Sequence, residues 1–305
     1  MDRLHAAIAQ ARKAREAVLA GAGPAMEAEA HAPAYSDPSM FQAPKPRRPV
    51  APVEDATVTT SDPDAAWAAL PYHAPPVDAL LQRKIVTRDG GPKSAPFDVL
   101  RTRALQQMSA QGWRRLAITS PGPGCGKSTV TMNLAFSLAR QPDIRTVVID
   151  LDLRRPMIAS LLGLDTGHEI TSAIRGTTSV ADQMVRVADN LAFATTANPV
   201  HDPAELLQGR RMTEMLLRLE DDFAPDVILF DLPPIMVSDD AIAFLPNADC
   251  ALMIAAAEQS TLGDVDACEK ELAAQTNVLG VVLNKCGHGN DGGRYGYGYG
   301  YGSDG

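Results

Sequence analysis

The chain has 305 residues, 45% of them hydrophobic and 21% charged, which is the balance of an ordinary globular protein. Its net charge of −9 argues against a protein whose main task is to hold a nucleic acid backbone, so we expect no nucleic acid partner. No apolar run reaches the roughly 18 residues that a membrane-spanning helix needs, and the N-terminus lacks the apolar core of a signal peptide. The 4 cysteines are scattered, as is typical of a reducing compartment, and we expect a cytoplasmic protein.

The N-terminal part of the chain is not expected to form a domain. Residues 1–20 predict an amphipathic helix, which would dock on a partner, touch an anionic membrane surface or remain a solvated helix. Residues 21–92 are rich in proline and alanine and poor in large apolar side chains. Such a segment buries too little apolar surface to offset chain entropy, so it predicts a disordered linker. Short local helices are expected only around residues 67–70 and 77–86.

Residues 93–286 alternate between helical and extended patterns. We predict helices over residues 96–111, 127–140, 211–221 and 261–275, and strands over residues 116–119, 146–150, 191–195, 227–231, 251–256 and 279–283. These strands are apolar nearly throughout, which is typical of parallel strands covered on both faces. The pattern therefore predicts an α/β domain with a doubly wound, mostly parallel sheet.

Residues 287–305 form a tail of a different composition, with nine glycines in nineteen residues, and predict a flexible segment. Four of the 6 tyrosines of the chain lie there: Tyr295, Tyr297, Tyr299 and Tyr301. No tyrosine lies between Tyr72 and Tyr295, so core packing does not explain the cluster. The exposed phenols are either phosphoryl acceptors or part of a low-complexity tail without chemistry.

The strongest chemical signal is the loop Ser120-Pro-Gly-Pro-Gly-Cys-Gly-Lys-Ser-Thr129, which lies between a predicted strand and a predicted helix. Its glycines let successive backbone N–H groups turn towards phosphates, and the next helix presents its positive end to them. Lys127 would reach the β- and γ-phosphates, and the Ser128 hydroxyl would ligate Mg²⁺. The loop predicts a nucleotide site, and its position between strand and helix disfavours a glycine-rich turn with an incidental lysine.

Carboxylates stand at the ends of two other predicted strands. Asp150 and Asp152 follow the strand over residues 146–150, and Asp231 ends the strand over residues 227–231. In open α/β sheets, ligands bind at this edge. One of the first two aspartates could hold a metal while the other accepts a proton from an attacking hydroxyl, and Asp231 suits the role of orienting Mg²⁺ or its water. The alternative is helix capping and loop solvation, which are common uses of aspartate.

Taken together, these motifs resemble the bacterial tyrosine kinases of exopolysaccharide and capsule synthesis, the CpsD/CapB type, which are related to the cytoplasmic domain of Wzc-like proteins. The resemblance rests on the phosphate loop over residues 121–129, Asp150-Leu-Asp-Leu-Arg-Arg-Pro156, Asp231-Leu-Pro-Pro234 and the terminal tyrosines, and covers about residues 95–305. It implies a MinD-like P-loop NTPase fold, ATP and Mg²⁺ as cofactors, and ATP-dependent phosphorylation of the tail in trans.

The resemblance also implies roles for individual residues. The catalytic residues would be Lys127, Asp150, Asp152 and Asp231, with Asp152 as the proton acceptor. The metal would be held by Ser128, Asp150 and Asp231. The ATP-binding residues would be Gly122, Gly124, Cys125, Gly126, Lys127, Ser128, Thr129 and Arg154. The phosphoacceptors would be the four tail tyrosines.

The partners implied by the resemblance are a transmembrane polysaccharide co-polymerase as activator, a cognate tyrosine phosphatase and further copies of the chain. The protein would then be recruited to the inner face of the membrane through the co-polymerase. Two departures from the family pattern stand out. Pro121 occupies the first glycine position of the phosphate loop, and the oligomerisation pattern E-x-x-R-x-x-R reads Ala95-Pro-Phe-Asp-Val-Leu-Arg101, which keeps only its last arginine and leaves ring formation open.

Two other functions compete with the kinase. A MinD/ParA-like positioning ATPase would carry a signature lysine five residues before Lys127, and this chain has Gly122 there. A non-catalytic nucleotide-binding scaffold for polysaccharide assembly would not need the three aspartates beside the phosphate loop.

Overall fold

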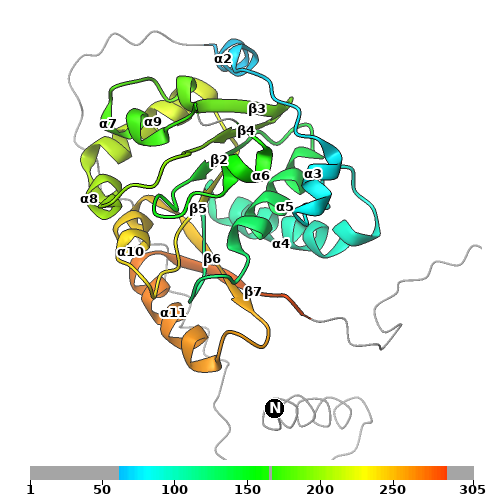
Figure 1. The fold of residues 1–305 in the computed structure, drawn as a ribbon, viewed down its shortest axis with the longest axis vertical. Helices are drawn as coiled ribbons and strands as arrows, with labels where there is room; N and C mark the ends of the chain where they lie inside the picture. Colours follow the sequence, from blue (N-terminus) through cyan, green and yellow to red (C-terminus); the bar gives the residue numbers. More distant parts are fainter. Residues whose placement is uncertain (1–61, 165–166, 287–305) are drawn as a thin grey trace, which may run out of the picture. The chain divides into compact units, whose positions relative to one another are not determined.

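The computed structural model describes residues 62–164 and 167–286 (Figure 1). The predicted N-terminal helix, most of the predicted linker and the tyrosine-rich tail lie outside these residues. A 7-stranded sheet with the order β3-β4-β2-β5-β1-β6-β7 organises the described part of the chain. The strands are β1 Arg115–Thr119, β2 Thr146–Asp150, β3 Met184–Ala188, β4 Leu191–Ala194, β5 Val227–Asp231, β6 Cys250–Ala256 and β7 Asn277–Asn284.

All neighbouring strands run parallel except β3 and β4, which are antiparallel. The prediction of a doubly wound, mostly parallel α/β sheet is therefore confirmed, and each predicted strand is present. The strand β3 was not predicted. It lies at the edge of the sheet, where Arg186 is only half-buried and interrupts the apolar run that marks the other strands.

Ten α-helices of the described residues cover the sheet: α2 Pro63–Ala69, α3 Val77–Gln82, α4 Ala95–Gln111, α5 Lys127–Ala139, α6 Ile158–Leu162, α7 Ile170–Arg175, α8 Pro203–Gln208, α9 Arg210–Phe223, α10 Asp240–Phe244 and α11 Leu262–Gln275. The four long predicted helices correspond to α4, α5, α9 and α11. None of the helices in this part of the chain combines the length and the apolar character needed to cross a bilayer.

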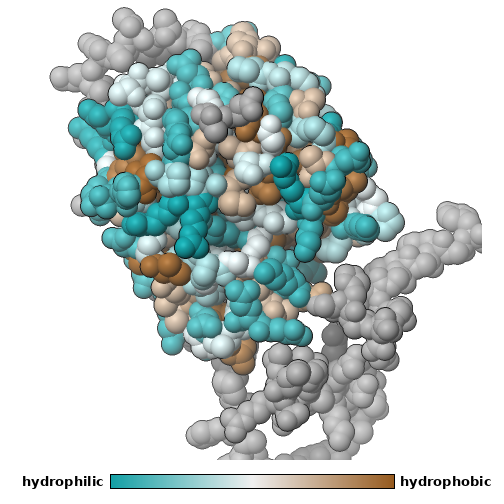
Figure 2. Space-filling model, viewed as in Figure 1, coloured by the Kyte–Doolittle hydropathy of each residue, from teal (hydrophilic) through white to brown (hydrophobic). Residues whose placement is uncertain are grey.

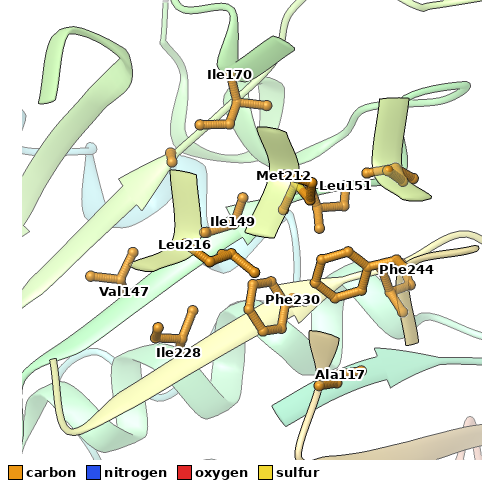
Figure 3. Close-up of a cluster of buried hydrophobic side chains, with 14 of the residues drawn as sticks. Ala117, Val147, Ile149, Leu151, Ile170, Met212, Leu216, Ile228, Phe230 and Phe244 are labelled. Atoms are coloured by element: carbon orange, nitrogen blue, oxygen red, sulfur yellow. The ribbon is translucent and has the colours of Figure 1, made fainter. Parts of the chain in front are cut away.

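The helices form a layer on each face of the sheet, because successive residues of a strand point to opposite faces. On β2, Val148 joins the core under α3, α4, α5 and α6, whereas Val147 and Ile149 join the core under α2, α7, α8, α9, α10 and α11. Figure 3 shows the second core, where the rings of Phe230 on β5 and Phe244 on α10 lie 4.6 Å apart between centroids. The central strands are thus covered on both faces, and Asp150 and Asp231 lie at the carboxyl ends of β2 and β5.

The outer surface contrasts with these cores. On the face seen in Figure 2, hydrophobic residues are in small separate groups among hydrophilic ones. Solvent-facing hydrophobic groups of this kind are normal for a globular domain.

The structure corrects the expected extent of the linker. The short helices expected around residues 67–70 and 77–86 are present as α2 and α3, but they pack against the cores instead of lying in an unpacked linker. The buried apolar side chains of this segment are Trp67, Leu70, Leu80 and Ile85. Trp67 packs edge-on against Phe223 of α9, with 6.2 Å between ring centroids. The packed part of the described chain therefore includes α2 and α3, because a few large side chains suffice to bind a short segment to the sheet.

The substitution Trp67→Ala tests this docking. Trp67 is 3% exposed, so its removal leaves a cavity, and we expect a loss of about 3–5 kcal/mol in the free energy of unfolding. Urea unfolding followed by circular dichroism measures it. The control is Leu81→Ala on α3, whose side chain is 51% exposed and should change stability by only about 0.5 kcal/mol. Equal effects of the two substitutions would contradict the docking of α2.

Candidate active site

The site lies at the carboxyl ends of three neighbouring strands. The sheet order places β2, β5 and β1 side by side, and the register pairs Asp150 of β2 directly with Asp231 of β5. The loop of residues 120–126 follows β1 and leads into α5. The topology therefore brings together the three motifs that the sequence places far apart.

The phosphate loop has the backbone that its glycines predict. Gly124 and Gly126 have φ angles of 75° and 89°, in the left-handed region that favours glycine. Gly126 is the N-cap of α5 and supplies no side-chain cap, so the first N–H groups of that helix remain available to an anion. Gly122 has ordinary backbone and open space around it, so it accommodates the Pro121 departure without a special conformation.

Two residues that sequence reasoning missed hold this loop from the side of β6 and β7. The Asn284 side-chain amide donates to the Cys125 carbonyl at 2.9 Å, and the Gln259 amide donates to the Pro123 carbonyl at 2.9 Å. The Cys125 side chain is buried, with its sulfur 3.7 Å from the Ser260 hydroxyl, so of this predicted ATP-binding residue only the backbone remains for phosphate.

The side chains of the site surround Lys127. Its ammonium lies 2.5 Å from Oδ2 of Asp152, and both side chains are largely buried. Asp150 accepts hydrogen bonds from the backbone N–H groups of Met157 and Ile158 at 3.1 and 2.9 Å. These contacts fix the positions of the Lys127 ammonium and of the carboxylates of Asp150 and Asp152 before any ligand is bound.

Asp231 is the third carboxylate of the site and is fully buried. Its Oδ1 accepts from the Thr131 hydroxyl at 3.2 Å, and its Oδ2 has no hydrogen-bond partner among the described residues. A buried carboxylate oxygen without a partner is costly unless a cation or water completes it. The described residues contain no ready cluster of three or more metal-ligating side chains, so a metal here would share its coordination with Ser128, water and phosphate, as Mg²⁺ usually does.

The shifted pKa values of the site follow from the burial of several carboxylates around Lys127. Burial and the neighbouring Asp231 raise the pKa of Asp150 well above its usual range. Burial likewise raises the pKa of Asp231, against the opposing effect of Lys127. Burial alone would lower the pKa of Lys127, but Asp231 and Asp152 outweigh it and raise that pKa. Three carboxylates face one ammonium, so the protein groups alone leave excess negative charge that a cation would neutralise.

Arg154 lies beside this centre in an ion pair that the sequence did not predict. Its guanidinium donates to the two carboxylate oxygens of Asp240 at 2.5 and 3.0 Å and to the His201 carbonyl at 3.2 Å. Asp240 opens α10, is fully buried and also accepts from the Ser238 hydroxyl at 2.9 Å. The contacts of Arg154 thus join the loops that follow β2, β4 and β5, and its contact with ATP stays a prediction.

Of the remaining predicted site residues, Ser128 and Thr129 lie in the described part of the chain and the four tail tyrosines do not. Ser128 and Thr129 form the first turn of α5 next to Lys127. The Ser128 hydroxyl helps to hold down the pKa of Asp231, so it lies near that carboxylate, and its role as a ligand of Mg²⁺ stays a prediction. Tyr295, Tyr297, Tyr299 and Tyr301 lie outside the described residues, so their role as phosphoacceptors stays a prediction.

Comparison with known families shows which family the chain belongs to. The model of the ParA family, described as NUBPL iron-transfer P-loop NTPase, matches residues 113–293, which is more than half of the chain. The chain belongs to this family of P-loop NTPases. The family match supports a nucleotide-binding fold for this chain, and the roles of Lys127 and the strand-end aspartates in it stay predictions.

Relatives within the family are more specific. EpsB of Ralstonia solanacearum is 31% identical over 251 residues, covering 76% of this chain and 33% of its own length. The tyrosine-protein kinase YwqD of Bacillus subtilis is 28% identical over 222 residues, covering 71% of this chain and 92% of its own length. The kinase domain of the Escherichia coli tyrosine kinase ETK superposes with a TM-score of 0.60 at 25% identity, covering 68% of this chain and 80% of that one. The resemblance to bacterial tyrosine kinases is confirmed, although the chain spans only about a third of the EpsB relative.

The substitution Gly126→Ala tests the shape of the phosphate loop. A Cβ at this position would clash with the Asn284 amide nitrogen and would hold alanine at a φ of +89°. We expect nucleotide affinity to fall about tenfold or more, since this φ and the clash together cost more than about 1.4 kcal/mol. Titration with a fluorescent ATP analogue measures it. Gly167→Ala is the matched control, because a Cβ there also meets nothing within 4 Å and the residue lies outside the phosphate loop, and a similar loss in both variants would refute the assignment.

The crowded carboxylates predict a dependence of stability on pH. A carboxyl whose pKa is higher in the folded than in the unfolded chain binds more protons when folded, so the free energy of unfolding falls as pH rises through that interval. Without nucleotide or divalent cation, we expect stability to fall as pH rises above about 4, the usual aspartate value. Asp150→Asn should flatten this fall, because it removes the carboxyl whose pKa is raised well above its usual range.

Urea unfolding at a series of pH values measures the effect. The control is Asp266→Asn on α11, where the aspartate is exposed and should leave the pH profile unchanged. If the free energy of unfolding changed with pH equally in the wild type and in Asp150→Asn, the site would not raise the pKa of Asp150.

Proposed function

We propose that this protein is an ATP- and Mg²⁺-dependent protein tyrosine kinase of exopolysaccharide or capsule synthesis, and that it phosphorylates its own tail on Tyr295, Tyr297, Tyr299 and Tyr301. The observation that carries the proposal is the Lys127–Asp152 contact of 2.5 Å between the phosphate loop and a second strand end, in a chain whose terminal tyrosines supply acceptors. The relative YwqD is named as a tyrosine-protein kinase, and so is CpsD of Streptococcus pneumoniae.

The residues have complementary tasks in this reaction. The N–H groups of the phosphate loop and the ammonium of Lys127 bind and orient the β- and γ-phosphates. Asp150, Asp231 and Ser128 fit Mg²⁺, which would neutralise phosphate charge when bound. A tail phenol attacks the γ-phosphorus, the bond to ADP breaks, and the phenol proton passes to Asp152. Asp152 becomes available as Lys127 turns from it towards the phosphates.

The partners of the reaction are part of the same proposal. A transmembrane polysaccharide co-polymerase would activate the kinase at the inner face of the membrane, and a tyrosine phosphatase would reverse the modification. Transfer would take place between copies of the chain. Asp98 of α4 accepts from the Ser137 hydroxyl at 2.7 Å and from Arg140 at 2.9 Å, and Arg101 donates to the Ser137 carbonyl at 3.0 Å. The degenerate oligomerisation stretch thus bonds within its own chain, and we do not assign the contact between copies to it.

The experiment is autophosphorylation of the full chain with MgATP and the cytoplasmic segment of the co-polymerase, followed by mapping of the phosphates by mass spectrometry. We expect phosphate on the tail tyrosines, and a loss of about 100-fold or more in Lys127→Met, because a charged group that stabilises the transferring phosphoryl is removed. Lys270→Met on α11 is the control, since this lysine is exposed and far from the site in sequence.

The competing functions predict different results. Intact ATP hydrolysis without tyrosine phosphate would refute the kinase and favour the positioning ATPase. Nucleotide binding with neither reaction would favour the scaffold.

A further inference from the structure

The two edges of the sheet differ in how they are covered. β3 forms one edge and β7 forms the other (Figure 1). Along β3, the Arg186 N–H donates to the Pro71 carbonyl and the Arg186 carbonyl accepts from the His73 N–H, both at 2.8 Å. In the part of the chain that the structure describes, nothing pairs with the outer side of β7. Such an edge presents a row of backbone N–H and C=O groups to which another segment can add as a strand.

β7 also lacks the charged residues and prolines that usually protect an open edge. Its sequence is Asn277-Val-Leu-Gly-Val-Val-Leu-Asn284, and with 8 residues it is the longest strand of the described sheet. Val281 is 47% exposed and Leu283 is 61% exposed. Because they are two residues apart, their side chains lie on the same face of the strand. The edge therefore offers an apolar strip as well as backbone groups for pairing.

The chain changes direction where β7 ends. Lys285 has a φ of 57°, in the left-handed region, which ends the extended backbone of the strand. The Cys286 thiol then donates to the Leu283 carbonyl at 3.5 Å, so this side chain is directed back to the strand. Residues 287–305 follow immediately. The tail is thus joined directly to the strand whose outer edge is open.

The sequence of the tail complements this edge. Residues 287–293 read Gly-His-Gly-Asn-Asp-Gly-Gly and are turn formers, and a connection this short joins neighbouring strands only in the antiparallel sense. Tyrosine then alternates with glycine from Tyr295 to Tyr301, so in a strand all four phenol rings lie on one face. Cross-strand pairs of an aromatic and a β-branched residue stabilise a sheet. The period of the tyrosines equals the spacing of Val281 and Leu283.

We propose that residues 294–301 dock on the open edge of β7 of the same chain as an additional antiparallel strand, with tyrosine rings packed on Val281 and Leu283. The docked tail withholds its tyrosines from the active site of another copy, and local opening of the strand supplies them. This role rests on the proposed kinase function, whereas the docking itself does not.

Phosphorylation releases the docked tail. A phosphotyrosine carries about two negative charges, which cannot pack on apolar side chains without loss of their hydration. The neighbouring helix α11, which packs on β7, adds repulsion because it carries four carboxylates and one lysine. The unmodified tail is therefore bound to β7, and the phosphorylated tail is free.

Hydrogen–deuterium exchange followed by mass spectrometry tests the docking. The sample is the full chain, treated with a tyrosine phosphatase and free of nucleotide, and the reference is a synthetic peptide of residues 287–305. We expect the amides of residues 294–301 to exchange about tenfold more slowly in the full chain than in the peptide, since exchange then requires opening of the added strand. Equal exchange in the full chain and the peptide would overturn the proposal.

Variants of the apolar strip test where the tail binds. Val281→Glu and Leu283→Glu place a charge under the tyrosine rings at exposed positions, so residues 294–301 should exchange as fast as in the peptide. Leu81→Glu on α3 is the matched control and should leave the slow exchange unchanged. Replacing the four tail tyrosines by serine leaves the folded domain untouched and should also abolish the slow exchange. Persistence of slow exchange in all of these variants, with the fold intact by circular dichroism, would overturn the proposal.

Other occupants of the edge give different results. Slow exchange of the tail that disappears on dilution would place it on another copy and overturn docking within one chain. Slow exchange of β7 with free exchange of the tail would mean that a different segment covers the edge, which also overturns the proposal.

The rate of tail phosphorylation tests the consequence for the kinase. With MgATP, Val281→Glu should incorporate phosphate into the tail severalfold faster than the wild type, because its tail is not withheld, and ATP hydrolysis should not change. An unchanged rate with a released tail would overturn the withholding. Absence of tyrosine phosphate in every variant would refute the proposed function, while hydrogen exchange would still decide the docking.

Discussion

The burial of several negative charges around one ammonium is the constraint on which the rest of this structure depends. Asp150 and Asp231 are fully buried at the ends of adjacent strands, and Lys127 reaches Asp152 at 2.5 Å. Taking such groups out of water is costly, and the attraction of one ammonium does not compensate three carboxylates. A site of this kind is therefore incomplete without a cation, and its raised carboxyl pKa values record that incompleteness. A divalent cation that accompanies a nucleotide would supply positive charge at these carboxylates, and such strongly perturbed pKa values are typical of functional sites.

The surrounding fold holds this unfavourable arrangement in place from three directions. Backbone N–H groups of Met157 and Ile158 fix Asp150, and Thr131 of α5 fixes Asp231. The Arg154–Asp240 pair ties the loop after β2 to α10. On the opposite side, Asn284 and Gln259 hold the phosphate loop from the ends of β7 and β6. Each of these contacts crosses between elements, so the preorganised centre is a property of the whole sheet edge rather than of any one motif.

The sequence predicted what depends on local pattern. Apolar runs revealed the buried parallel strands, and the glycine loop before Lys127 revealed the nucleotide site. The edge strand β3 escaped because Arg186 breaks its apolar pattern, and its stability comes from pairing with β4. The packing of residues 62–92 escaped because their average composition is that of a linker, while the few large side chains such as Trp67 decide where they lie. Gln259 and Asn284 could not be predicted, since each reaches the phosphate loop from more than 130 residues away in sequence, and no local pattern encodes such a contact.

Asp98 also makes contacts between elements, at a position where the sequence departs from the pattern E-x-x-R-x-x-R. Burial alone would raise the pKa of Asp98, but hydrogen bonds from Ser137, Ser94 and Arg140 lower it, so the carboxylate is ionised and firmly held. Two of these donors belong to the segment of α5 and its C-cap, the helix that begins at Lys127. An acidic residue where the family has a basic one thus does not leave α4 with an unsatisfied charge. The carboxylate of Asp98 is bound by the helix that begins at Lys127, so α4 becomes part of the support of the active site.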